Sequence, residues 1–136
     1  MERKEFVKKF AIGGSVLLAV PTFLSSCAVG DEEIFIHELT IDLTSSEFSE
    51  LGIVGGFAYK DDIIIIRTGD SQYTALTKIC THQGCTVSYS AASNQLPCPC
   101  HGSLYNISGG VINGPALQSL KKYDVRVDGD LLIITL

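Results

Sequence analysis

Short apolar runs dominate the chain after residue 30, and none of them recurs at the spacing of a long amphipathic helix. Residues 63–67 form an unbroken aliphatic run, which is typical of a strand that is buried on both faces. A polar segment over residues 45–51 suits a loop or a single helical turn. The other predicted strands before residue 80 are residues 33–39, 41–43, 53–59 and 72–79.

Turn-forming residues separate these runs. Asp61-Asp62 and Thr68-Gly69-Asp70 are predicted turns, and Gly55-Gly56 indicates a bulge or a close backbone approach. Asp128-Gly129-Asp130 lies between apolar runs at residues 123–127 and 131–136, which predicts a hairpin whose glycine adopts a positive φ. Many short strands at close spacing predict an all-β fold, a small antiparallel sandwich or barrel.

Composition limits the class of protein. The chain has 136 residues, of which 46% are hydrophobic and 18% charged, as expected for one globular domain. Its net charge of −5 argues against nucleic-acid binding, which needs a basic face.

The N-terminal segment has the layout of an export signal. Basic residues precede an apolar run over residues 10–24, which is short for a membrane span of about 20 residues but suits the apolar part of a signal. Leu24-Ser25-Ser26-Cys27 resembles the lipobox of bacterial lipoproteins, which implies cleavage before Cys27 and a lipid on its sulfur. The alternative is an uncleaved anchor. Residues 3–8 also resemble a twin-arginine signal, with lysine in the second place.

The distribution of charged residues supports cleavage of the chain at Cys27. Residues 1–27 have a net charge of +2, whereas residues 28–136 have −7, so a polybasic attachment to anionic lipid is excluded for the mature part. We expect a signal peptide over residues 1–26, a lipid-anchored tether over 27–33 and a folded domain over 34–136. That arrangement places the domain in the periplasm or at the cell exterior, where disulfides persist.

A loop-rich segment over about residues 78–117 interrupts the strand pattern, and we expect it to form an inserted subdomain. It contains Cys80-Thr81-His82-Gln83-Gly84-Cys85 and Cys98-Pro99-Cys100-His101-Gly102-Ser103. Thiolate and imidazole at this spacing form half of a metal site in each cluster. Three interpretations are open: a structural zinc site, two plain disulfides, and a [2Fe–2S] centre with mixed cysteine and histidine ligands.

These two motifs resemble the cluster-binding loops of the Rieske family, in the branch with an extra cysteine in each loop, as in cytochrome bc-type complexes and arsenite oxidase small subunits. The resemblance implies one [2Fe–2S] cluster per chain, with Cys80 and Cys98 on one iron and His82 and His101 on the other. It further implies a disulfide between Cys85 and Cys100.

The same resemblance assigns roles to four residues that bind no iron. The hydroxyl groups of Ser103 and Tyr105 would donate to a bridging sulfide and to Cys80, and so raise the reduction potential. Gly114 and Pro115 resemble the start of the loop that covers the cluster, although Leu117 stands where the family usually has proline. The alternatives are a loop cap, a packing tyrosine and an ordinary turn.

These observations predict an exported, membrane-anchored carrier of one electron with a high-potential cluster. The alternatives are a subunit of a quinol-oxidising cytochrome bc-type complex or of an arsenite-oxidase-like enzyme, and a redox sensor. The expected partners are redox proteins such as a cytochrome, a quinol and the membrane. We do not expect a ring-hydroxylating oxygenase, because such enzymes need a second, mononuclear iron site and a much longer chain.

Overall fold

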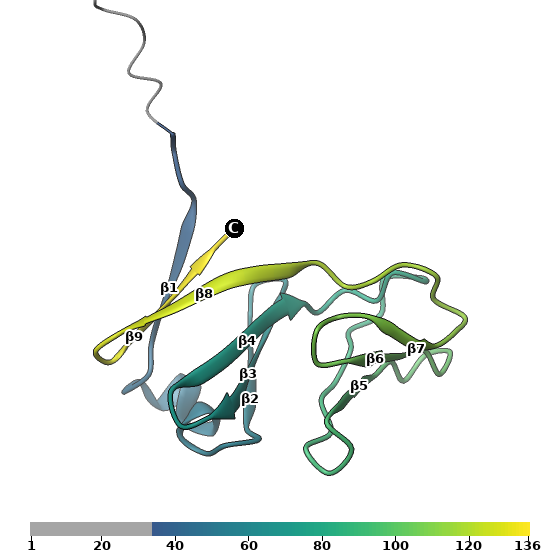
Figure 1. Cartoon of the computed structure of the whole chain (residues 1–136), viewed down its shortest axis with the longest axis horizontal. Helices are drawn as coiled ribbons and strands as arrows, with labels where there is room; N and C mark the ends of the chain where they lie inside the picture. Colours follow the sequence, from purple (N-terminus) through teal and green to yellow (C-terminus); the bar gives the residue numbers. More distant parts are fainter. Residues whose placement is uncertain (1–33) are drawn as a thin grey trace, which may run out of the picture. The chain divides into compact units, whose positions relative to one another are not determined.

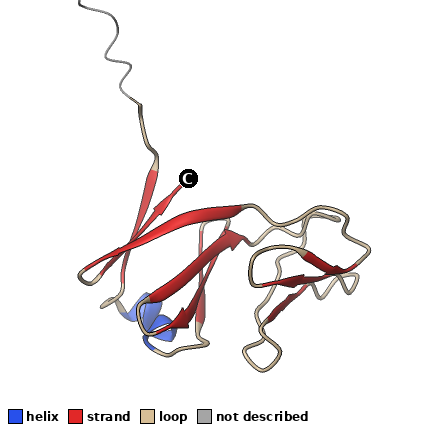
Figure 2. Ribbon diagram, viewed as in Figure 1, coloured by secondary structure: helices blue, strands red, loops and turns tan. Residues whose placement is uncertain are grey.

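The computed structural model describes residues 34–136, of which residues 36–136 form one unit built from two antiparallel sheets (Figures 1 and 2). The larger sheet has the strand order β1-β9-β8-β4-β3-β2, and the smaller has the order β5-β6-β7. The larger sheet consists of β1 (Glu38–Asp42), β2 (Phe57–Lys60), β3 (Ile63–Gly69), β4 (Gln72–Thr77), β8 (Lys122–Asp128) and β9 (Leu131–Thr135). The smaller consists of β5 (Gln95–Pro97), β6 (Leu104–Asn106) and β7 (Val111–Asn113). The predicted all-β, antiparallel fold is confirmed.

Strand β3 separates two hydrophobic cores. Successive side chains on a strand point to opposite faces, so Ile63 and Ile65 pack into one core while Ile64 and Ile66 pack into the other. All four isoleucines are buried, which confirms the interpretation of this run as a strand covered on both faces. The core that contains Ile64 and Ile66 also contains Cys80 and Cys98, so packing of the large sheet directly supports the predicted metal site.

The hairpin predicted at Asp128-Gly129-Asp130 forms as expected. Strands β8 and β9 pair in register from Asp124 opposite Thr135 to Asp128 opposite Leu131, and Gly129 has φ 59°. Asp61 in the turn between β2 and β3 also adopts a left-handed conformation, with φ 50°. Short acidic side chains tolerate this conformation better than most residues.

Two predicted strands begin later than expected. The strand predicted over residues 33–39 starts at Glu38 and continues to Asp42 as the single strand β1. Residues 53–59 were predicted to be extended throughout, but β2 starts at Phe57, and the preceding residues follow the 3₁₀ helix η2 (Ser46–Gly52). The helix buries Phe48 and Leu51, which are three residues apart and therefore share a face. Gly56 packs its backbone against the carbonyl of Glu50, so a side chain there would collide with the helix. The glycine pair therefore marks a close approach, as expected.

The segment between β4 and β8 forms an insertion. Ala75 pairs with Tyr123 and Leu76 with Lys122, so the two strands are neighbours although more than forty residues separate them in the chain. This confirms the inserted subdomain, but the segment is not only loops, because β5, β6 and β7 lie within it. Across residues 34–136, no helix is long and apolar enough to cross a membrane.

Candidate metal centre

The two cysteine-histidine motifs fold into turns of the same design. In loop 1 (residues 80–85) the first residue's N–H donates to the carbonyl of the sixth at 2.7 Å, and in loop 2 (residues 98–103) the same bond measures 2.8 Å. The N–H of the fifth residue donates back to the first carbonyl, at 3.0 Å and 3.1 Å. That fifth residue is Gly84 or Gly102, with φ of 78° and 79°, a conformation that favours glycine. Each turn therefore has a fixed frame that begins with a buried cysteine.

A disulfide between Cys85 and Cys100 ties the two loops together, as the family resemblance implied. Cys80 and Cys98 remain free thiols and are buried, with relative exposures of 3% and 2%. The alternative of two plain disulfides is therefore wrong. Two buried cysteines that stay reduced beside a disulfide are expected where their sulfurs bind a metal and not each other.

Local hydrogen bonding distinguishes the two free thiols. Burial raises the pKa of Cys80, but the Tyr105 hydroxyl and the backbone N–H groups of His82 and Gln83 outweigh it, and the pKa lies below its ordinary value. Burial raises the pKa of Cys98, and the neighbouring Cys80 adds to this rise. Two thiolates so placed repel each other, and a cation bound by both sulfurs would stabilise them together.

The two histidines face each other at the same place. The ring centroids of His82 and His101 lie 4.8 Å apart, with an angle of 84° between the ring planes. The His82 Nδ1 atom is buried and has no hydrogen-bond partner among the described residues, while the His101 side chain is exposed. A buried, unsatisfied imidazole nitrogen is costly, and a metal ion is a partner that satisfies it.

This donor set fits a two-iron centre better than a zinc ion. Structural zinc sites bring four ligands onto one ion. Within residues 34–136, no three side chains of histidine, cysteine, aspartate or glutamate converge on a single point. Two thiols and two imidazoles in separate pairs suit a [2Fe–2S] centre, in which each iron takes only two protein ligands.

Of the two predicted tuning residues, Ser103 is the last residue of loop 2 and Tyr105 lies in the following strand, β6. Tyr105 is fully buried, and its Oη lies 3.2 Å from Cys80 Sγ. Ser103 is also fully buried, and its Oγ accepts from the N–H of Ala116 at 3.0 Å. Because this bond uses only a lone pair, the Ser103 hydroxyl keeps its proton free to donate elsewhere.

The predicted cover loop, which we define as residues 114–118, lies over one side of the site. The Gly114–Pro115 peptide bond is cis, Ala116 is buried, and Leu117 is 94% exposed. A pocket of about 270 Å³ lies between this loop and loop 1, lined by Thr81, His82, Pro115, Leu117 and Gln118. The lining includes Thr81 and Gln118, which sequence patterns did not single out.

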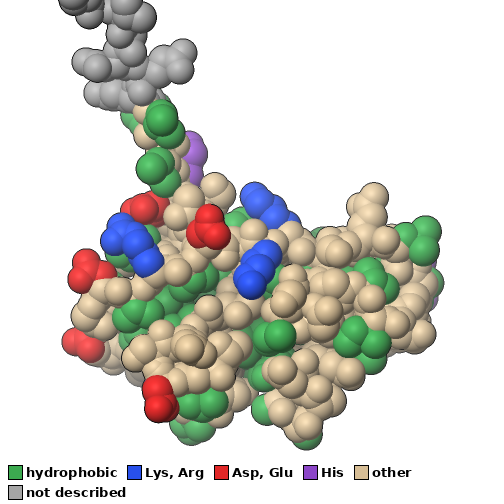
Figure 3. All heavy atoms as spheres, in the orientation of Figure 1, with side chains coloured by type: hydrophobic (Ala, Val, Ile, Leu, Met, Phe, Trp, Pro, Cys, Tyr) green, Lys and Arg blue, Asp and Glu red, His purple; other side chains and the backbone are tan. Residues whose placement is uncertain are grey.

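Charge is distributed unevenly between the two parts of the domain. The chain contains no aspartate or glutamate from residue 71 to residue 123, a stretch that includes both loops and the cover loop. Figure 3 shows this on one face, where acidic side chains lie over the large sheet and none lies over the cluster-binding part. The two loops and the cover loop therefore contribute no carboxylate that would oppose the arrival of an electron.

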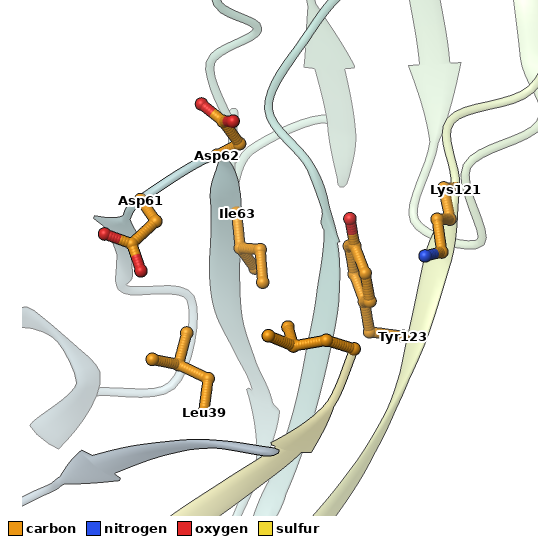
Figure 4. Close-up of a pocket in the computed structure, with 7 residues that line it drawn as sticks. Leu39, Asp61, Asp62, Ile63, Lys121 and Tyr123 are labelled. Atoms are coloured by element: carbon orange, nitrogen blue, oxygen red, sulfur yellow. The ribbon is translucent and has the colours of Figure 1, made fainter. Parts of the chain in front are cut away.

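A second pocket, of about 240 Å³, lies at the large sheet and contains none of the predicted site residues (Figure 4). Its lining combines aliphatic side chains with two carboxylates and one ammonium group. These residues are Leu39, Asp61, Asp62, Ile63, Lys121, Tyr123 and Leu136.

Comparison with known proteins agrees with this geometry. The profile of the Rieske [2Fe-2S] domain family matches residues 39–124, which is more than half of the chain. The cytochrome b6-f complex iron-sulfur subunit of Chlorobaculum thiosulfatiphilum is 33% identical over 136 residues, covering 98% of this chain and 75% of that protein.

Solved structures give the same result. The cyanobacterial plasma membrane Rieske protein PetC3 from Synechocystis PCC 6803 has a TM-score of 0.59 and 26% identity, covering 72% of this chain and 99% of that one. The ferredoxin of carbazole 1,9a-dioxygenase from Nocardioides aromaticivorans IC177 has a TM-score of 0.53 and 25% identity, covering 60% and 85%. The chain thus belongs to the Rieske [2Fe–2S] family, and it is an electron-transfer protein that carries one such cluster.

Proposed function

We propose that Cys80 and Cys98 hold one iron of the cluster and that His82 and His101 hold the other. The two thiols are buried and free, and the two imidazole rings lie 4.8 Å apart. The observation that carries the assignment is the buried His82 Nδ1, which has no protein partner within residues 34–136. When bound, the cluster supplies a centre that takes up and releases one electron.

Removal of one imidazole tests this assignment. We expect His82→Ala to lose iron and the electron paramagnetic resonance (EPR) signal of the reduced cluster. His37→Ala is the matched control, since His37 is the third histidine of the chain and is exposed just before β1. A His82→Ala protein that keeps two irons per chain and an unchanged spectrum would contradict the assignment.

The residues around this site favour a high potential. With two neutral imidazoles, an oxidised centre has no net charge, whereas four thiolates would give −2, so the added electron meets less repulsion. Rieske centres lie at roughly −150 to +300 mV, against about −400 mV for plant-type ferredoxins. The acid-free stretch and the hydroxyl groups of Ser103 and Tyr105 support a potential in the upper half of that range.

We infer further that the chain is the iron–sulfur subunit of a quinol-oxidising complex of the cytochrome b6-f or bc kind. The similarity to the Chlorobaculum thiosulfatiphilum subunit extends over 98% of the chain. The pocket beside His82 has an apolar rim, including Leu117 and Pro115, which suits a molecule with a ring and an apolar tail. If Nδ1 of His82 held iron, the second ring nitrogen would be available to accept a hydrogen bond from a hydroxyl group of such a partner.

The second candidate is a carrier that works outside a complex. Its support is the similarity to a plasma membrane Rieske protein and to a ferredoxin, each covered almost throughout its length. Purification from native membranes under mild conditions separates the two candidates. Co-purification with a b-type cytochrome and reduction of the cluster by added quinol would favour the subunit, while isolation alone with no response to quinol would favour the carrier.

We propose that a lipid on Cys27 attaches the protein to the membrane. This cysteine, the signal over residues 1–26 and the tether over 27–33 lie outside the described residues, so their support is the sequence pattern alone. The folded domain would then lie in the periplasm or at the cell exterior. Incorporation of a labelled fatty acid that is lost in Cys27→Ser would support the anchor, and unchanged labelling would contradict it.

A further inference from the structure

The Thr81 side chain links the cover loop to the buried tyrosine of the site. Its Oγ1 donates to the backbone carbonyl of Gln118 at 2.7 Å, across 37 positions of the chain. The same Oγ1 lies 3.0 Å from Tyr105 Oη, and the Thr81 N–H donates to that Oη at 3.2 Å. One residue of loop 1 thus contacts both the cover loop and the tyrosine that reaches Cys80.

A count of protons fixes the direction of these bonds. A threonine hydroxyl has one proton, and a carbonyl oxygen can only accept, so the Thr81 proton is used by Gln118. Thr81 Oγ1 can then only accept from Tyr105. Tyr105 also has one proton, and two acceptors lie within reach: Thr81 Oγ1 at 3.0 Å and Cys80 Sγ at 3.2 Å. These two acceptors compete for that proton.

We propose that Thr81 is a positioning residue that couples the cover loop to the reduction potential by competing with Cys80 for the Tyr105 proton. The inference rests on the proposed ligation of iron by Cys80. While Gln118 accepts from Thr81, the chain of bonds from Tyr105 through Thr81 to Gln118 is cooperative and draws the proton away from the sulfur. When the cover loop leaves Thr81, that chain is broken and the proton returns to Cys80.

The coupling is reciprocal, since two linked equilibria must affect each other equally. Reduction makes the sulfur a stronger acceptor, because hydrogen bonds to charged groups are stronger than those to neutral ones. The Tyr105 proton then moves toward Cys80, and the bond between Thr81 and Gln118 loses its cooperative support. Reduction therefore loosens the cover loop, which forms one wall of the pocket beside His82.

Two substitutions at one position test the proposal through the midpoint potential. Thr81→Val removes the competing acceptor and should raise the potential so that the ratio of reduced to oxidised protein, at a fixed applied potential, rises at least twofold. For one electron, this is about 18 mV, given 59 mV for a tenfold change. Thr81→Ser keeps the hydroxyl and should restore the original potential. A Thr81→Val protein with an intact cluster and an unchanged or lower potential would overturn the proposal.

A double substitution shows whether the effect runs through Tyr105. In a Tyr105→Phe background there is no proton to compete for, so Thr81→Val should leave the potential unchanged. An equal shift in both backgrounds would overturn the proposal. A Tyr105→Phe protein with an intact cluster and an unchanged potential would overturn the link from Tyr105 to Cys80 and with it this proposal. Failure of the proposed ligation would show separately, because Cys80→Ser would then keep two irons per chain.

The wild-type protein offers a readout that does not depend on any variant retaining its cluster. The N–H of Ala116 in the cover loop is buried and bonded to Ser103, so its hydrogen exchange reports opening of that loop. We expect exchange at Ala116 to be at least twofold faster in the reduced than in the oxidised protein. Equal or slower exchange in the reduced protein would overturn the coupling.

Discussion

Replacement of Tyr105 by phenylalanine removes a single hydroxyl group from the buried side of the site. The ring stays in the core that it shares with Ile64 and Leu96, but the donor 3.2 Å from Cys80 Sγ is lost. A hydroxyl that donates to a ligand sulfur stabilises the electron-rich state more than the oxidised state. The substitution should therefore lower the midpoint potential.

The size of the effect follows from the strength of that bond. Hydrogen bonds contribute about 0.5–1.5 kcal/mol between neutral groups and about 1.5–3 kcal/mol to charged ones, so the gain on reduction is on the order of 0.5–1.5 kcal/mol. Since 59 mV for one electron corresponds to about 1.4 kcal/mol, we expect the potential to fall by about 20–60 mV. Sharing of the proton with Thr81 places the result in the lower part of this range.

A redox titration followed by EPR measures this shift. Tyr89→Phe is the matched control, because Tyr89 packs against the same core but its hydroxyl donates to Asn94 at 2.8 Å, away from the sulfur. The control should keep the wild-type potential. A Tyr105→Phe protein that holds its cluster at the wild-type potential or above it would refute the reasoning.

Two further predictions concern the frame around the site. Cys85→Ser removes the bond to Cys100, which closes a loop of 15 residues, and should destabilise the paired loops by about 3 kcal/mol, seen as faster loss of cluster absorbance on heating. Gly56→Ala puts a methyl group into the carbonyl of Glu50 and should lower the free energy of unfolding in urea by about 3 kcal/mol or more. Gly52→Ala, which meets nothing within 4 Å, should change it by less than about 1 kcal/mol, and equal effects would contradict this account.

The sequence predicted the large sheet because its strands follow simple physical rules. The four isoleucines of β3, the turn at Asp61 and the hairpin at Gly129 each carry a local signal that the fold retains. The predicted start of β2 was wrong because residues 53–56 form a turn after the helix, in which the Gly56 N–H donates to the Ile53 carbonyl and Gly55 has φ 89°. A pattern of apolar residues cannot separate such a turn from an extended run.

The smaller sheet carried no such signal. Its strands have three residues each, too few for alternation to show, and they lie among glycine and proline residues. Strands β5 and β6 pair on either side of loop 2, so their pairing depends on the turn that this loop forms and not on an alternation of apolar residues. The approach of Tyr105 to Cys80, by contrast, followed from the family resemblance, and the distance agrees with it.

The link from Thr81 to Gln118 is the part of the site that no sequence pattern indicated. Threonine after a cysteine and glutamine in a loop are ordinary residues, and the bond uses the backbone carbonyl of Gln118, which every residue type has. Only the structure shows that these two residues, 37 positions apart in the chain, are joined by a bond of 2.7 Å. Its consequence is a hydrogen-bonded connection from the cover loop through Thr81 and Tyr105 to the sulfur of Cys80.

The most direct test of the central claim is pulsed EPR of the reduced protein, grown with ¹⁵N-labelled histidine. The account predicts two irons and two sulfides per chain and hyperfine coupling to two imidazole nitrogens, one each from His82 and His101. A protein that contains zinc, or an iron centre with no coupled histidine nitrogen, would contradict it.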